Sequence, residues 1–106
     1  MEIPDDVEKE LENRGGVDEL VKSIDEDRIS EESQVYKALS DPKRLKILTI
    51  LNEQNLCVCL LKEILDIADS KLSYHLSVLK DRGLIEGERD ANFVIYNITD
   101  KGKKYV

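Results

Sequence analysis

Residues 57 to 82 constrain the fold more than any other part of this sequence. Leucine and isoleucine recur at helical spacing over residues 57 to 66, and leucine does so again in the next segment, which extends to Arg82 and ends before Gly83. The apolar stripe of that second segment is Leu72, Leu76 and Leu79. A turn over residues 67 to 70 separates the two patterns, and Asp69 or Ser70 can cap the second helix. Two short helices joined in this way predict a helix-turn-helix.

Two strand-like runs follow the second helix. They cover residues 84 to 89 and 93 to 98, and they flank Asp90-Ala91-Asn92, which has the turn chemistry of a β-hairpin. Thr99 can then cap one last helical turn. The expected fold class is therefore mainly α with a small β-hairpin, a winged helix-turn-helix, with an N-terminal helical extension.

The segments before residue 57 also show helical signals. Asp41-Pro42 marks the start of a helix that runs to about Glu53, because proline is tolerated in a first helical turn. Ser30 is the expected cap of the helix before it. Gly15-Gly16 separates a short helical stretch over residues 4 to 13 from another that begins at Val17.

Charge is unevenly distributed along the chain. Residues 1 to 32 carry 13 acidic and 4 basic side chains, a net of −9, whereas residues 33 to 106 carry 10 acidic and 12 basic ones, a net of +2. The whole-chain net charge of −7 therefore belongs to the N-terminal part. A domain at +2 still attracts phosphate when its cations converge on one face. We expect an acidic helical arm over residues 1–29 and a winged helix-turn-helix DNA-binding domain over residues 30–106.

Several classes of protein are excluded by what the sequence lacks. No apolar run approaches the roughly 20 residues that span a bilayer, and the acidic N-terminus lacks the basic and apolar regions of a signal peptide. We therefore expect a cytoplasmic protein with no membrane partner and with reduced thiols. The sequence contains no nucleophile and base pairing, phosphate loop or carboxylate pair, so we expect no catalytic residues and no enzyme activity.

The side of the second helix away from its leucine stripe carries small hydroxyls and one tyrosine. On a helical wheel these outward residues are Ser70, Ser73, Tyr74 and Ser77. The cations that could face phosphate are Lys71, Lys80, Arg82 and Arg89. Two interpretations remain open for this surface. It reads DNA, or it carries ordinary solvated charges on a winged-helix module that binds another protein.

Five segments, in their joint order and spacing, carry a resemblance to a known family. They are Leu39-Ser40-Asp41-Pro42-Lys43-Arg44-Leu45-Lys46-Ile47-Leu48, Leu56-Cys57-Val58-Cys59, Ser73-Tyr74-His75-Leu76-Ser77-Val78-Leu79-Lys80, Gly83-Leu84-Ile85 and Val94-Ile95-Tyr96. Over roughly residues 33 to 99 the chain resembles the winged helix-turn-helix repressors of the ArsR/SmtB metalloregulator family, in particular arsenic repressors. The resemblance implies a homodimer that binds a double-stranded operator and represses transcription until an inducer binds.

The DNA contacts expected from this resemblance fall into two groups. Lys71, Lys80 and Arg89 are expected to contact phosphates, and Ser70, Ser73 and Tyr74, with Ser77 on the same face, are expected to face base edges. Two-fold symmetry would place a second copy of the recognition helix about one turn of DNA away. No cofactor is required for this binding.

Cys57 and Cys59 are the only thiols, and the resemblance implies that they bind a metalloid or metal inducer. Two thiolates select soft ions such as As(III), Sb(III), Cd(II) or Pb(II). On a regular helix the two side chains would point about 200° apart, so joint chelation requires an unwound first turn. The third cysteine of the family's arsenic-sensing triad is replaced by Lys62, and the aspartate usual after the second cysteine by Leu60.

Other interpretations of the cysteine pair stay open. The two residues could be small buried hydrophobes, or thiols that respond to oxidation with no metal sensing, although a direct disulfide is disfavoured by its strained geometry. The family's zinc site on a long C-terminal helix is excluded, because the sequence has neither that helix nor its histidines. The only histidine, His75, lies on the shoulder of the leucine stripe, where we expect a partly buried, hydrogen-bonded side chain rather than a metal ligand.

The dimer interface is the last expectation. Family dimers generally use the first and last helices, and the last helix here is at most two turns long. The N-terminal helices are the candidate replacement, through Leu20, Val21, Ile24, Val35 and Leu39. Packing of these residues onto the core of their own chain is the alternative.

Overall fold

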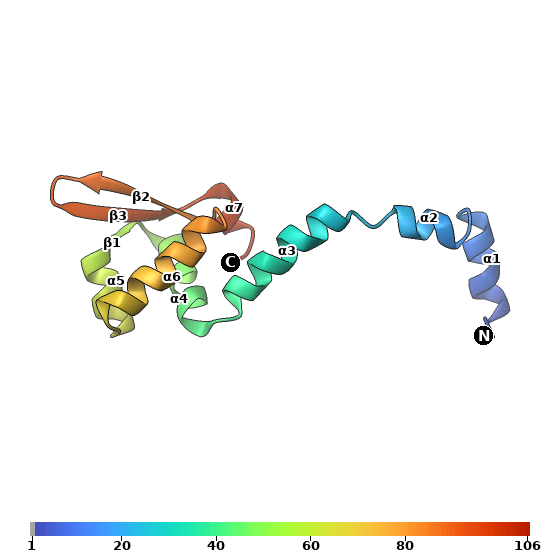
Figure 1. The fold of residues 1–106 in the computed structure, drawn as a ribbon, viewed down its shortest axis with the longest axis horizontal. Helices are drawn as coiled ribbons and strands as arrows, with labels where there is room; N and C mark the ends of the chain where they lie inside the picture. Colours follow the sequence, from blue (N-terminus) through green and yellow to red (C-terminus); the bar gives the residue numbers. More distant parts are fainter. Residues whose placement is uncertain (1) are drawn as a thin grey trace. The chain divides into compact units, whose positions relative to one another are not determined.

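The computed structural model of the chain describes residues 2 to 106. It is mainly helical with one small antiparallel sheet, which confirms the expected winged helix-turn-helix (Figure 1). The helices are α1 (Asp5–Asn13), α2 (Val17–Lys22), α3 (Glu26–Leu39), α4 (Pro42–Glu53), α5 (Val58–Leu65), α6 (Asp69–Asp81) and α7 (Asp100–Lys103). The strands are β1 (Leu56–Cys57), β2 (Ile85–Asp90) and β3 (Phe93–Ile98).

The described chain divides into two compact units, and the division falls within α3. One unit ends at Ser33, and the other spans Gln34–Val106. We call residues 2 to 33 the arm and Gln34–Val106 the winged unit.

Within the arm, Gly15 and Gly16 separate α1 from α2, as expected. Both adopt positive φ angles, 98° and 87°, a region that favours glycine because it has no Cβ. The cap of α3 differs from the expectation. Ser30 lies inside the helix, and the Asp25 carboxylate accepts the Arg28 N–H at 3.1 Å. Aspartate provides this cap because its oxygen reaches the N–H three residues ahead.

The winged unit holds the hydrophobic core. Thirteen buried apolar side chains form one cluster drawn from α3, α4, α5, α6 and the sheet. Leu72, Leu76 and Leu79 of α6 are all buried in this cluster, which confirms the stripe that the sequence predicts. Val35, at the C-terminal end of α3, is fully buried in it as well.

The sheet has the order β1-β3-β2, with both pairs antiparallel. The hairpin β2–β3 turns at Ala91 and Asn92, and Ala91 takes a positive φ of 54°. Strand β1 adds two residues to the other edge of β3, where Leu56 pairs with Tyr96 and Cys57 with Ile95. The helix expected over residues 57 to 66 therefore begins one residue later, because Cys57 is held in the sheet.

Of the two expectations for the ends of α6, the one for its start is wrong and the one for its end is correct. Its N-cap is Ala68, with no side-chain cap hydrogen bond, so neither Asp69 nor Ser70 caps it. Its C-terminus is followed by Gly83 at a φ of 72°, as a glycine after a helix predicts. Asp41 caps α4 as expected, by accepting the Lys43 N–H at 2.8 Å, and Thr99 caps α7 by accepting the Gly102 N–H at 3.0 Å. Over residues 2 to 106, every helix is too short or too polar to cross a bilayer.

Candidate nucleic-acid interface and cysteine site

The outward face of α6 carries all of its predicted DNA-contacting residues. Ser70, Lys71, Ser73, Tyr74, Ser77 and Lys80 are all exposed. Residues 70, 73, 74 and 77 repeat at helical spacing, so they form one stripe, and the two lysines border it. Tyr74 is 62% exposed, so most of its ring is open to solvent on this face.

A hollow of about 630 Å³ lies between the start of α4 and the start of α6. Ser70, Lys71 and Tyr74 of the predicted set line it. They are joined there by Lys43 and Lys46 of α4, which the sequence interpretation did not include. Ser77, Lys80 and Ser73 do not line this hollow; they lie farther along or across the same helix face.

The two predicted cations outside α6 have different surroundings. Arg89 is exposed on β2, where it pairs in register with Val94 of β3. Arg82 is partly buried, and its Nη1 donates a hydrogen bond to the Gln34 side-chain oxygen in α3. Arg82 therefore serves a contact within the winged unit, while Arg89 stays available on the wing.

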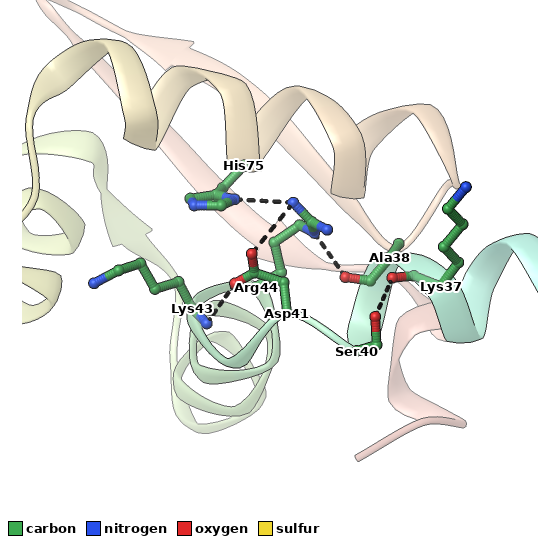
Figure 2. A network of polar contacts seen from close by, with 7 residues as sticks. All are labelled: Lys37, Ala38, Ser40, Asp41, Lys43, Arg44 and His75. Carbon is green, nitrogen blue, oxygen red and sulfur yellow. Dashed lines mark hydrogen bonds and ion pairs between the residues drawn. The ribbon is translucent and has the colours of Figure 1, made fainter.

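A polar network joins α3, α4 and α6 (Figure 2), and two of its members, Asp41 and His75, also line the hollow. At its centre is Arg44, whose side chain is only 13% exposed. Its Nε donates to the Ala38 carbonyl oxygen at 2.6 Å, and its Nη1 lies 3.1 Å from His75 Nδ1 and 3.8 Å from an Asp41 carboxylate oxygen. The guanidinium carbon also lies 5.9 Å from the centre of the Tyr74 ring, within range of a cation–π contact.

His75 is buried and hydrogen-bonded, which confirms its expected role. Because a guanidinium can only donate, His75 Nδ1 must accept, and the proton of the neutral ring is on Nε2. Burial lowers the pKa of His75 below its ordinary 6.5, against the opposing effect of the Asp41 carboxylate. For Asp41, desolvation raises the pKa, but the N–H groups of Lys43 and Arg44 and the Arg44 charge outweigh it and lower the pKa below 3.8.

The cysteine pair lies where the sheet meets α5. Cys57 is the last residue of β1 and Cys59 is in the first turn of α5, and the structure joins them by a disulfide with the Cα atoms 5.3 Å apart. The expectation that a direct disulfide is disfavoured, and that the thiols are reduced, is wrong here. Cys57 is extended and only Cys59 is helical, so the two side chains are not directed to opposite sides as they would be on one regular helix.

The same geometry removes one of the alternatives. Cys59 is exposed and Cys57 only partly buried, so they are not two buried hydrophobes. They line a hollow of about 430 Å³ with Phe93 at the start of β3 and with Lys62 and Asp69. Lys62 Nζ lies 2.8 Å from an Asp69 carboxylate oxygen, an ion pair that links α5 to the first residue of α6.

The ligand set at this position is limited to two sulfur atoms. Among residues 2 to 106, no group of three or more His, Cys, Asp or Glu side chains is arranged to hold a metal ion. Thiolates bind soft ions once the disulfide is reduced, and any third ligand must then come from outside this set.

Sequence reasoning missed the contribution of α4 to this surface. It places Lys43, Arg44 and Lys46 at the start of a helix and within a family resemblance, with no role in DNA binding. A cationic run directly after a helix cap, in the helix that precedes a helix-turn-helix, was the available signal.

Comparisons with known proteins agree with this architecture. A sequence model described as "Bacterial regulatory protein, arsR family" matches residues 41–87. The chain is 44% identical over 69 residues to an arsenical resistance operon repressor of Bacillus subtilis (strain 168), and the match covers 64% of this chain and 66% of that protein. It is 36% identical over 73 residues to a homologue of the cadmium resistance transcriptional regulatory protein CadC from Staphylococcus aureus, and that match covers 68% and 60%.

The fold also matches a solved structure. It is similar to HlyU from Vibrio cholerae N16961, with a TM-score of 0.70 and 30% identity over 76% of this chain and 87% of that one. The chain spans about two thirds or less of the length of the two curated relatives above.

Proposed function

Because the chain belongs to the arsR family of bacterial regulatory proteins, we propose that it is a DNA-binding transcriptional regulator that acts as a repressor. It is accordingly not an enzyme, and we propose the cytoplasm as its site of action. The observation that carries the proposal is the outward stripe of α6, where Ser70, Ser73, Tyr74 and Ser77 are exposed beside Lys71 and Lys80. Hydroxyls and a tyrosine contact base edges, and flanking lysines contact phosphates.

The wing extends this surface. Arg89 on β2 is exposed, and a cation on a hairpin next to a recognition helix can hold a neighbouring phosphate. A single helix reads only a few base pairs, so useful specificity requires two copies. We therefore propose a homodimer on a double-stranded operator.

The arm is our candidate for the dimer interface. No residue of α1 or α2 is buried, and Leu20, Val21 and Ile24 are 47%, 59% and 46% exposed. Amphipathic helices of this kind need an apolar partner. Val35 and Leu39 do not belong to this set, because Val35 is buried in the core of its own winged unit and Leu39 packs against it. A Leu20→Ser, Ile24→Ser variant should sediment as a monomer, whereas Ile64→Ser, an exposed apolar residue on α5, should not change the mass.

A salt titration tests DNA binding. The full chain is titrated against a fluorescein-labelled duplex, selected from a random pool by the protein itself, at several KCl concentrations. A repressor that neutralises phosphates must lose affinity steeply as salt rises, with a linear log–log slope. A winged-helix protein-interaction module is the alternative, and the absence of any salt-sensitive complex would favour it.

Cys57 and Cys59 are the proposed inducer site, for a thiophilic ion such as As(III), Sb(III), Cd(II) or Pb(II). Arsenical and cadmium resistance regulators among the similar proteins support this ligand class. A ligand that bridges the two sulfurs would act on β1 and on the first turn of α5, and hence on the wing through the Cys57–Ile95 pair and on α6 through Lys62 and Asp69. Titration of the reduced protein should give two thiols consumed per ion.

A second candidate signal is oxidation, and the disulfide between Cys57 and Cys59 favours it. An oxidised low-molecular-weight disulfide would exchange with the dithiol, form the protein disulfide and release two small thiols. Comparison of DNA affinity for the reduced and oxidised protein without any metal decides between the two signals. An oxidation response with no ion response identifies a redox regulator.

A further inference from the structure

The hollow between α4 and α6 carries an inference beyond the residues already assigned to DNA binding. We propose that it is a phosphate site for the DNA backbone, in which Lys43 and Lys46 of α4 and the Nε2–H of His75 hold one phosphodiester group. This rests on the proposed function and adds α4 to the DNA-binding surface.

The charge of the hollow fits an anion. Lys43, Lys46 and Lys71 line it, against a single carboxylate, that of Asp41. That carboxylate is occupied within the chain, because it accepts the Lys43 N–H at 2.8 Å and lies 3.8 Å from Arg44. Three lysines around one shared space repel one another unless an anion enters, and phosphate is the anion that lysine side chains most often contact on DNA.

His75 supplies a directional donor. The residue is only 8% exposed, yet it lines the hollow, and its Nδ1 is used by Arg44. The proton is therefore on Nε2, for which residues 2 to 106 offer no acceptor. Figure 2 shows that this second nitrogen lies on the side of the ring away from Arg44, and that the Lys43 side chain extends to the same side in this view. A donor that lines a hollow without a protein acceptor takes its acceptor from outside the chain.

The position of the hollow favours a phosphate of DNA over a free anion. Ser70 and Tyr74 line it and also belong to the outward stripe of α6, so a phosphodiester here would be continuous with the bases that the stripe faces. The guanidinium of Arg44 fixes both His75 Nδ1 and the α3 carbonyl of Ala38, which holds the donor in place before DNA arrives.

The first test uses the lysines. Affinity for a random-sequence duplex of about 30 base pairs is measured from roughly 50 to 200 mM KCl for the full chain and for Lys43→Gln, Lys46→Gln and Lys104→Gln. Each hollow variant should lower the log–log salt slope by about 0.9 for each phosphate that the protein no longer neutralises. Lys104→Gln removes the same charge from an exposed position outside the hollow and should leave the slope unchanged.

The outcomes separate this inference from the proposed function. A steep wild-type slope that neither Lys43→Gln nor Lys46→Gln reduces overturns the phosphate site and leaves the repressor intact. A wild-type protein without any salt-sensitive complex overturns both. The ¹⁵N signal of His75 Nε2 should shift on addition of the duplex but not of inorganic phosphate at the same ionic strength. A shift with inorganic phosphate alone overturns the DNA assignment and identifies a free-anion site instead.

A matched pair of substitutions tests His75 itself. His75→Asn keeps an acceptor for Arg44 but removes the donor to the hollow, whereas His75→Gln can keep the donor and loses the acceptor. The Asn variant should bind DNA about three to ten times more weakly with near-normal urea stability, the value of one hydrogen bond. The Gln variant should bind DNA with near-normal affinity and should have a lower stability in urea. Affinity that follows stability in both variants overturns the role of His75, and if either fails to fold, the lysine variants decide.

Discussion

Helices α4 and α5 both pack against α6 through the hydrophobic core, but their polar contacts with α6 are of opposite kinds. At α4 the contact is buried and polar, since Arg44 is 13% exposed and joins Ala38 to His75. At α5 the contact is an ion pair between Lys62 and Asp69, whose side chains are 48% and 78% exposed, next to the exposed Cys59. A buried polar group that loses its partner is expensive, whereas an exposed ion pair is worth little. The polar contact at α4 therefore holds α6 more firmly than the ion pair at α5, which can change at small cost.

This difference explains why a chemical signal would enter at α5. The cysteine pair joins the end of β1 to the start of α5, and β1 is also the edge strand of the wing. A change in the state of the two sulfurs acts on elements whose polar contact with α6 is weak and which share the hydrophobic core with it. A structural change of similar size at the buried Arg44 network would disturb the core.

The largest effect is expected from breaking the α4 contact. Arg44→Ala should lower the free energy of unfolding by about 3 kcal/mol, because the Ala38 carbonyl and His75 Nδ1 both lose their donor. Urea unfolding followed by circular dichroism measures it. Arg44→Lys should fall between the wild type and the alanine variant, since it keeps the charge without the fork of donors. If Arg44→Ala lowers the free energy of unfolding by less than about 0.5 kcal/mol, the polar contacts at α4 and α5 do not differ in strength.

Acidification should weaken the same contact by a smaller amount. The pKa of His75 is lowered by burial, so at a pH between its folded and unfolded pKa values the folded protein binds fewer protons than the unfolded one. The stabilisation is complete above the unfolded pKa of about 6.5 and is lost as the pH falls below it. Unfolding in urea at several pH values should show this decline in the wild type. His75→Asn should flatten it, and equal declines in the two proteins would argue against His75 as its source.

The smallest effect is expected at α5. Lys62→Ala or Asp69→Asn should change stability by less than about 0.5 kcal/mol, because both side chains of this ion pair are largely in water. Thermal unfolding of the two variants and of the wild type, each in its reduced and its oxidised form, measures this change in stability. A destabilisation as large as that of Arg44→Ala would mean that α5 holds α6 as firmly as α4 does.

Local signals predicted much of the winged unit. Asp41-Pro42 indicated the start of α4, Gly83 the end of α6, and Asp90-Ala91-Asn92 the hairpin, because caps, glycines and turns act on their neighbours in sequence. The shoulder position of His75 on the wheel was enough to predict its burial.

The features that were missed depend on distant residues. Cys57 is extended because it pairs with Ile95, which comes 38 positions later in the chain, and no local pattern shows such a pairing. The Arg44–His75 contact spans 31 positions, and Lys43 and Lys46 reach the α6 surface only through the packing of two helices. Ala68 caps α6 by its backbone alone, so the prediction of a side-chain cap from Asp69 or Ser70 was wrong.

The central claim is that the state of Cys57 and Cys59 controls DNA affinity through the α5 side of α6. The most direct test measures the dissociation constant for the selected duplex in the wild type and in the double variant Cys57→Ser, Cys59→Ser. Each protein is measured reduced, reduced with As(III) or Cd(II), and oxidised. At least one treatment should weaken wild-type binding about tenfold, a coupling of about 1.4 kcal/mol, and none should affect the serine variant. Equal affinities of the wild type in all states, or equal responses in the two proteins, would contradict the account.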